Sequence, residues 1–136
     1  MTPKAVRNAI MARYLTEFSG QFEIALDNQP FTPPETGSGV KWVRVSVRFS
    51  GGAQSSLGRS GTRRFQKQGM LFVQVFTPTG HATNDNDDLA EDSLNLFEGE
   101  KINDLWFYNG EIKTIGSDDE WYQQNVILEF NFDAIK

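Results

Sequence analysis

The densest group of possible metal ligands in this sequence is the acidic run at residues 84–88. Its acidic members are Asp85, Asp87 and Asp88. Carboxylate oxygens are ligands that Ca²⁺ prefers, but a calcium loop also needs a glycine at its sixth position and a glutamate at its twelfth. Counting from Asp85, those two positions hold Ala90 and Leu96. The calcium-loop pattern therefore fails, and an acidic helix N-terminus, where negative charge is stabilised, explains the run better.

Other catalytic chemistry has little support in the residue types. The chain has no cysteine, so thiol catalysis and thiolate zinc sites are excluded. His81 is the only histidine, and no nucleophile motif accompanies it, so we interpret it as a surface-loop residue. The glycines at residues 51–69 lack the Gly-Lys-Ser/Thr phrase of a phosphate-binding loop. We predict no catalytic residue, cofactor or metal site. An enzyme of unknown type is the minor alternative, and it would need a cleft with perturbed titratable groups.

Charges of opposite sign are segregated along the chain. No acidic residue lies between Glu35 and Asp85, whereas that stretch carries seven Lys or Arg. From Asp85 to Lys136 there are fourteen Asp or Glu against three Lys. The net charge of −5 argues against broad nucleic-acid binding, although the basic middle leaves a local version open. Two unlike patches suit a head-to-tail contact between identical subunits, which closes into a ring if the rotation permits.

The best candidate site is the basic segment at residues 59–67. Its charged members are Arg59, Arg63, Arg64 and Lys67. We predict that they contact acidic residues of the next subunit, in the run at 85–92 or in the acidic turn. That turn contains Asp118, Asp119 and Glu120. Two alternatives stay open, namely a solvated loop whose charges prevent unwanted strand pairing, and a contact with nucleic acid.

A second candidate contact is the proline-rich stretch around Phe31. Pro30, Pro33 and Pro34 favour extended backbone, and a rigid segment loses little entropy when it binds. The stretch could dock on a neighbouring subunit through Phe31, or it could cover the edge of its own sheet. The sequence does not separate these two possibilities.

The length of 136 residues predicts a single domain, 1–136, with a hydrophobic core. The lack of cysteine is typical of proteins that assemble inside a cell. Residues 1–15 have neither the long apolar stretch nor the cleavage site of a signal peptide. No stretch is long and apolar enough to span a bilayer, so we expect no membrane partner.

Hydrophobic periodicity predicts two helices and several strands. The first helix begins at Thr2-Pro3 and runs to Phe18, and the second begins at 84–88, with Asn84 or Asp85 as its cap, and ends at Gly99. The ranges expected as strands are 21–26, 40–50, 62–77 and 124–133.

Asn109-Gly110 predicts a tight turn between strands at 105–108 and 111–115, because this dipeptide supplies positive φ values. The Gly- and Ser-rich stretch 51–61 predicts a mobile loop. The fold class is therefore α+β, with a mixed, mainly antiparallel sheet of about five to six strands and two helices packed on it.

Several stretches resemble those of a known family. They are DNQPFTPP, WVRVSV, LGRSGTRRFQKQGMLFVQVFTPTG, LNLFEG and WYQQNVILEFNF. Over almost the whole chain they are similar to the tail terminator-like (minor tail protein U-like) proteins of long-tailed bacteriophages and their prophage relatives. The resemblance implies a structural virion protein without chemistry, usually a hexameric ring that caps the finished tail tube and presents a surface to the head connector.

The resemblance also implies the partners. They are further copies of the chain, the tail tube protein and the head–tail connector protein, with DNA only as cargo through the ring. The expected location is the virion tail, assembled in the cytoplasm of the bacterial host. A head–tail connector component, or a nucleic-acid-binding module that uses residues 59–67, remains the alternative.

Overall fold

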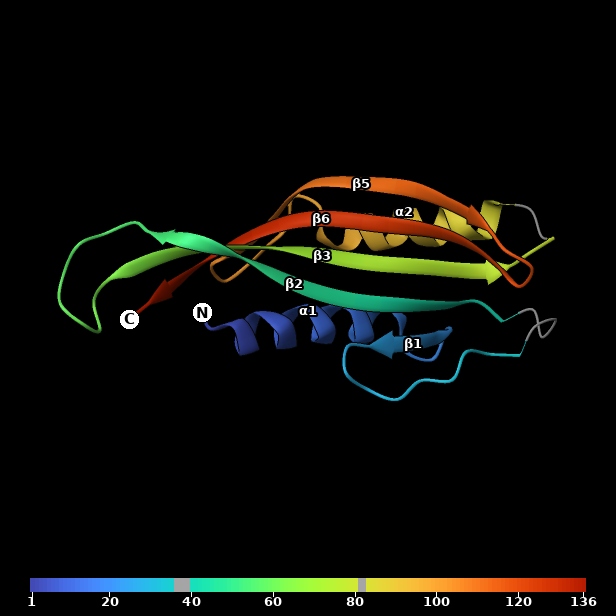
Figure 1. The fold of residues 1–136 in the computed structure, drawn as a ribbon, viewed down its shortest axis with the longest axis horizontal. Coiled ribbons are helices and arrows are strands. Elements are labelled where there is room, and N and C mark those ends of the chain that lie inside the picture. The colour runs from blue at the N-terminus through green and yellow to red at the C-terminus, as the bar shows by residue number, and fades with distance from the viewer. Residues whose placement is uncertain (36–39, 81–82) are drawn as a thin grey trace.

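Two helices and a six-stranded sheet make up the described part of the chain, which is residues 1–35, 40–80 and 83–136 of a computed structural model (Figure 1). The elements are α1 (Pro3–Phe18), β1 (Glu23–Leu26), β2 (Trp42–Gln54), β3 (Arg64–Pro78), α2 (Asn84–Phe97), β4 (Lys101–Ile102), β5 (Leu105–Ser117) and β6 (Trp121–Ile135). The strand order is β1-β2-β3-β6-β5-β4, in which only the β1–β2 pair is parallel. The predicted α+β class is confirmed. Neither helix of these ranges is long and apolar enough to cross a membrane.

Helix α1 begins and ends where the sequence predicts. The Thr2 hydroxyl accepts a hydrogen bond from the Ala5 amide at 3.1 Å, which satisfies one of the free amides of the first turn. Pro3 occupies the first helical position, where its missing amide costs nothing. The buried face consists of residues at helical spacing, namely Val6, Ile10, Tyr14 and Phe18.

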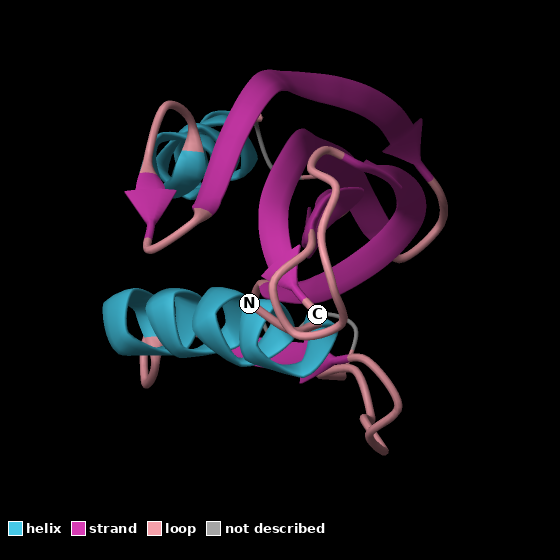
Figure 2. Cartoon of the chain, turned by 90° about the vertical axis from the view of Figure 1, so that its left-hand side faces the viewer, coloured by secondary structure: helices cyan, strands magenta, loops and turns pink. Residues whose placement is uncertain are grey.

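A single main core joins both helices to the same face of the sheet. Alternate strand residues point into it, as predicted, and they include Val43, Val45, Val47, Leu71, Val73, Val75, Val126, Leu128, Phe130 and Phe132. Tyr14 of α1 ties the two helices together, because its ring stacks on Phe97 at 6.5 Å and its hydroxyl is 3.0 Å from the Ser93 hydroxyl. Burial raises the pKa of Tyr14 well above its usual range, so this hydroxyl stays protonated. Figure 2 shows the two helices one above the other beside the curled strands.

Asn86 fixes the start of α2 on the sheet. Its side-chain amide is fully buried and donates to the Val75 carbonyl, the Thr77 hydroxyl and the Tyr122 carbonyl at 3.1–3.2 Å. Its side-chain oxygen accepts from Gln124 at 3.0 Å. One side chain therefore joins α2 to both β3 and β6. Its neighbours in the run stay exposed, and this non-local role was not visible in the sequence.

The opposite face of the sheet carries a smaller aromatic cluster. Trp42 stacks on Phe76 at 4.0 Å and meets the edge of Trp121 at 6.0 Å. Ala25 of β1 is buried in the same cluster, and Phe31 packs beside it. The cluster anchors β1 and the proline-rich stretch to the end of the sheet where β3 finishes.

The predicted hairpin at Asn109-Gly110 is wrong. Strand β5 runs through this dipeptide as one element, and its pairing with β6 shifts between Tyr108 and Glu111. The positive φ that this dipeptide predicts is present, since Asn109 has φ 50°, but it belongs to a bulge instead of a turn. The hairpin turn follows β4 instead, where Asn103 has φ 53°. Gly110 lies so close to the Leu94 and Glu98 side chains that a Cβ at this position would force both to shift.

Two further boundaries differ from the prediction. Residues 51–54, expected within a mobile loop, continue β2 and pair with residues 65–68 of β3. A bulge between Phe49 and Gly51 precedes this extension. The cap of α2 is Thr83, which makes no side-chain capping bond, instead of Asn84 or Asp85.

The far halves of β2, β3 and β6 form an arm that projects beyond α1. In Figure 1 this arm points to the left, and residues 55–63 close its tip. Strand β1 pairs with β2 only as far as Val45, and the Asp27 carboxylate accepts from the next outward amide, that of Val47, at 3.0 Å. Beyond Val47 the β2 edge of the arm is exposed.

We predict that Asn86→Ala destabilises the fold by about 2–4 kcal/mol, because it leaves buried carbonyl and amide groups of two strands without their partner. Urea denaturation followed by circular dichroism measures the change. The matched control is Asn95→Ala on the exposed side of the same helix, which should change stability by at most about 0.5 kcal/mol. Equal effects of the two substitutions would contradict the role assigned to Asn86.

Candidate interaction surfaces at the two ends

The first surface is the basic arm, defined here by Arg59, Arg63, Arg64, Lys67 and Lys136. Its tip is ordered by short polar contacts within the loop. The Thr62 hydroxyl donates to the Arg59 carbonyl at 2.8 Å, and the Ser56 hydroxyl accepts from the Arg64 amide at 2.8 Å. These bonds hold the loop backbone in place while the cationic side chains point away from any core.

Three cations of the basic arm surround one neutral ring, that of Phe65. The Arg63 guanidinium lies 5.7 Å from its centroid, and the Lys67 and Lys136 ammonium groups lie at 5.5 and 4.9 Å. Within the described residues, the only ion pair of the arm is Arg64–Asp133, at 3.6 Å and largely exposed. An exposed pair of this kind contributes about 0–1 kcal/mol. Most positive charge of the arm therefore remains available to a partner.

The second surface is the acidic end, defined here by Asp85, Asp87, Asp88, Asp118, Asp119 and Glu120. The fold brings its two halves together, although the sequence offered them as alternatives. The Thr79 amide donates to the Glu120 carbonyl at 3.0 Å, and the Thr79 hydroxyl donates to the Asp118 carbonyl at 2.9 Å. The Asp87 carboxylate accepts from the Gln124 side chain at 2.6 Å. The start of α2 and the β5–β6 turn thus lie at one end of the sheet.

Asp118 organises the β5–β6 turn. Its carboxylate accepts hydrogen bonds from the Trp121 amide at 2.7 Å and the Glu120 amide at 2.8 Å. These two amides hold the pKa of Asp118 below its usual value, with the Trp121 amide the larger cause. Since the carboxylate is already occupied by its own turn, Asp119 and Glu120 are the freer charges on this side.

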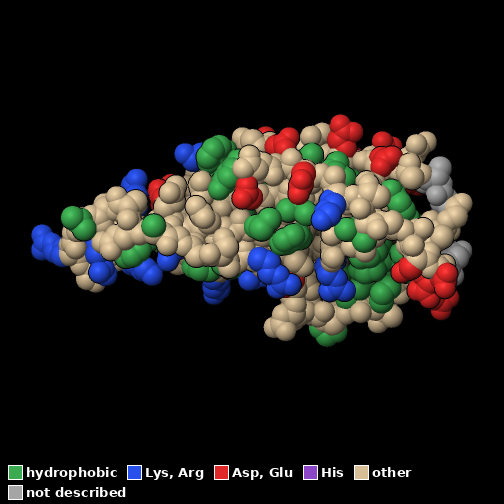
Figure 3. Space-filling model, turned by 45° about the horizontal axis from the view of Figure 1, so that its top comes forward, with side chains coloured by type: hydrophobic (Ala, Val, Ile, Leu, Met, Phe, Trp, Pro, Cys, Tyr) green, Lys and Arg blue, Asp and Glu red, His purple; other side chains and the backbone are tan. Residues whose placement is uncertain are grey.

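The two surfaces lie at opposite ends of the molecule. Strand β3 runs for 15 residues from Arg64 at the basic arm to Pro78 at the acidic end, which corresponds to about 45 Å along the strand at roughly 3.3 Å per residue. Figure 3 shows Lys and Arg side chains at the narrow left end, and Asp and Glu side chains mainly along the top and at the broad right end. In physiological salt the interaction between charges is screened over about 8–10 Å, so the basic arm and the acidic end of one molecule do not attract each other appreciably.

Phe31 lies on the acidic side of the molecule and contacts its own chain. Its ring is 5.1 Å from that of Trp42, and the side chain is half-buried. Packing over the protein's own sheet therefore accounts for this residue, and a contact with a neighbouring subunit stays a prediction. His81 lies outside the described residues.

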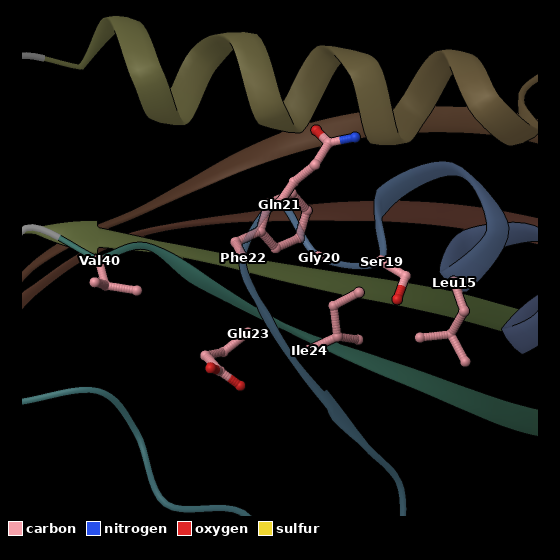
Figure 4. Close-up of a pocket in the computed structure, with 8 residues that line it drawn as sticks. All are labelled: Leu15, Ser19, Gly20, Gln21, Phe22, Glu23, Ile24 and Val40. Carbon is pink, nitrogen blue, oxygen red and sulfur yellow. The ribbon is translucent and has the colours of Figure 1, made fainter.

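The pockets of the described residues offer little for catalysis. One hollow of about 490 Å³ lies between the end of α1 and β1, lined by Phe22, Ile24 and Val40 among others, with Glu23 as its carboxylate (Figure 4). Within the described ranges, no group of three or more His, Asp or Glu could hold a metal ion. The surfaces with marked chemical character are therefore the two charged ends.

Sequence reasoning missed one feature beside the basic arm, an apolar hollow of about 370 Å³ at its base. Phe49 and Phe132 line it, and both belong to strands whose alternation the sequence shows. The available signal was the inward alternation of Phe130 and Phe132 up to Ala134, which extends the apolar face of the last strand beyond the stretch that a 16-residue helix can cover.

Comparison with known proteins agrees with the fold and identifies a family. A family model described as "Phage tail terminator protein" matches residues 5–123. A solved structure is similar with a TM-score of 0.69 at 20% identity, over 97% of this chain and 96% of that one. At this identity, the second likeness speaks for the fold alone. The search of curated proteins gave no match.

We predict that the β5–β6 turn keeps its capped form below the ordinary Asp pKa of about 3.9. Because the pKa of Asp118 is lower in the folded protein, its carboxylate stabilises the turn above the unfolded value, and this contribution is lost as the pH falls through the lowered pKa. An NMR titration that follows the Trp121 amide measures the midpoint. In the control variant Asp118→Asn, the pH-dependent shift of that amide should vanish. A midpoint at or above the ordinary Asp value would contradict the assignment.

Proposed function

This chain belongs to the phage tail terminator family, and from that premise we propose that it forms a ring that caps the tail tube and joins it to the head connector. Membership of the family makes the protein a structural component of a phage tail. The match covers residues 5–123, which is most of the chain, and it is the observation that carries the proposal. The work of such a protein is assembly, in which surfaces fit together and no bond is made or broken.

The charged ends support a head-to-tail contact between copies. A contact that joins two different patches repeats in one direction, and it closes into a ring when the rotation between copies permits. The basic arm of one copy would meet the acidic end of the next, as in the pairing of Arg63, Arg64 and Lys67 with the acidic residues. Complementary charges of this kind set the orientation of docking and raise its rate more than its affinity.

The same charges argue against placing the basic arm in the channel of the ring. DNA passes through such a channel only as cargo, and a strongly basic wall would retain it by binding phosphates. Arginines at subunit contacts have their charge neutralised by the neighbour and leave the channel weakly charged. The tail tube and the head connector would then meet the two flat sides of the ring.

We predict that the double variant Arg63→Glu and Arg64→Glu weakens self-association by about tenfold or more, because the reversed charges repel the acidic end. Light scattering after size exclusion, over a range of protein concentrations and at two salt concentrations, measures the mass. The unaltered protein should move from 15.4 kDa per chain towards a hexamer, and high salt should oppose this.

The matched control for charge is Lys41→Glu with Lys113→Glu, which makes the same change in net charge at positions outside the basic arm. This control should associate like the unaltered protein. Adding Asp119→Lys and Glu120→Lys to the Arg63 and Arg64 variant should restore association. Unchanged assembly of the first variant would show that the charged ends do not meet.

We predict that the purified protein stops the growth of tail tubes. When it is added to polymerising tube protein of the same phage, tubes should remain short and carry a cap at one end, as measured by electron microscopy. The control omits the protein. Tubes of unchanged length, together with retention of DNA in low salt, would instead favour the nucleic-acid-binding alternative.

A further inference from the structure

The core of this protein continues past the helix that covers it. Strands β2, β3 and β6 extend into the arm. Helix α1 begins at Pro3, at the base of the arm, so it does not cover the sheet face beyond that point. The uncovered part of the inner sheet face forms a hollow of about 370 Å³. We call it the arm hollow, and its lining includes Phe49, Phe132, Ala134, Ile135, Lys67 and Lys136.

The floor of the arm hollow is apolar and well ordered. Phe49 meets the edges of Phe130 and Phe132 at 5.9 and 6.1 Å, which fixes the orientation of the rings. Even so, Phe49 is 36% exposed and Ile135 is 53% exposed. Residues 1–3 line one side of the hollow and the Arg7 guanidinium lies 5.4 Å from the Phe49 ring centroid, yet these apolar side chains stay partly exposed, which is typical of an interaction site.

The rim of the arm hollow is cationic. Lys67 and Lys136 both line it, and both belong to the group of cations around Phe65. A partner that fits must therefore offer an apolar side chain with carboxylates beside it. This requirement combines an apolar centre with a charged rim, as in stable protein interfaces.

The acidic end of the same chain offers this combination. Ile115 is 51% exposed and lies three residues before the turn that contains Asp118, Asp119 and Glu120. The pairing of β5 with β6 is irregular between Thr114 and Gly116, which leaves Ile115 outside the regular ladder. Asp118 holds the following turn rigid through two backbone amides, so little order has to be gained on binding.

We propose that Ile115 of one copy inserts into the arm hollow of the next copy, with Asp119 and Glu120 beside Lys67 and Lys136. This inference rests on the proposed head-to-tail assembly and names the apolar contact within it. The β5–β6 turn of the neighbour then covers the part of the sheet face that α1 leaves exposed. Within one chain the contact is impossible, because the hollow and the turn lie at opposite ends of β6.

Disulfide trapping tests the contact directly, because the chain has no cysteine of its own. We expect the double variant Ile115→Cys with Ala134→Cys to form a ladder of covalent oligomers under mild oxidation. Ile115 lies beside Gln123 and Gln124 of β6, so the two sites are separated within a chain by about 35 Å of β6 at roughly 3.3 Å per residue. A disulfide needs Cβ atoms about 4 Å apart. The matched control moves one cysteine three residues along the same strand, as Ile112→Cys with Ala134→Cys, and should give no ladder.

A second pair of variants measures the contribution of the contact. Ile115→Ser should weaken self-association by about 10- to 100-fold, the range expected when one buried aliphatic side chain is lost. Ala134→Trp should do the same by filling the hollow. Ile115→Ser leaves the arm hollow intact, and Ala134→Trp leaves the Ile115 side chain intact. A mixture of the two variants can therefore form one complete contact, and it should give dimers that neither variant forms alone.

The outcomes separate this inference from the proposed function. Equal ladders for both cysteine pairs, or normal association of Ile115→Ser and Ala134→Trp with folding intact by circular dichroism, would overturn the arm-hollow contact. If the Arg63 and Arg64 variant still weakened association, the proposed assembly would stand without that contact. A protein that neither self-associates nor stops tube growth, and gives no ladder, would overturn both.

Discussion

The architecture depends on a difference in rise between a helix and a strand. Helix α1 has 16 residues and β3 has 15, yet the helix spans about 24 Å at roughly 1.5 Å per residue and the strand about 45 Å at roughly 3.3 Å. A helix of the same residue count therefore covers about half of such a strand. The rest of the sheet becomes the arm, its inner face becomes the arm hollow, and its length separates the two charged ends. Each of these surfaces follows from that one mismatch.

Local patterns predicted most of the elements but not how they meet. The bounds of α1 and the inward residues of β2, β3 and β6 follow from periodicity and a cap, which are properties of neighbouring residues. Asn109-Gly110 was misread because a positive φ serves a bulge as well as a turn, and only the pairing with β6 distinguishes them. The role of Asn86 was hidden for a related reason. Its partners lie on β3 and β6, 9 to 38 residues away in sequence.

The candidate site was predictable in its charges and not in its geometry. Segregation of basic and acidic residues is plain in the sequence, and so is the expectation that they face different copies. That both acidic groups share one end depends on the strand order, which places the end of β3 next to the start of β6. The apolar contact was missed because Phe49 and Ile115 look like ordinary core residues by pattern, and only the missing helix cover and the irregular β5 pairing leave them exposed.

The bulge between Phe49 and Gly51 has a consequence for solubility. The arm presents a long β2 edge whose outward amides lack a neighbouring strand beyond Val47, and flat edges of this kind recruit other edges into aggregates. A bulge bends and twists the strand in which it occurs, so two arms cannot lie flat against each other over their full length. Arg48, exposed just before the bulge, adds a like-charge penalty to an antiparallel pairing of two arms. The irregularity thus protects the exposed edge of the arm from pairing with other edges into fibres.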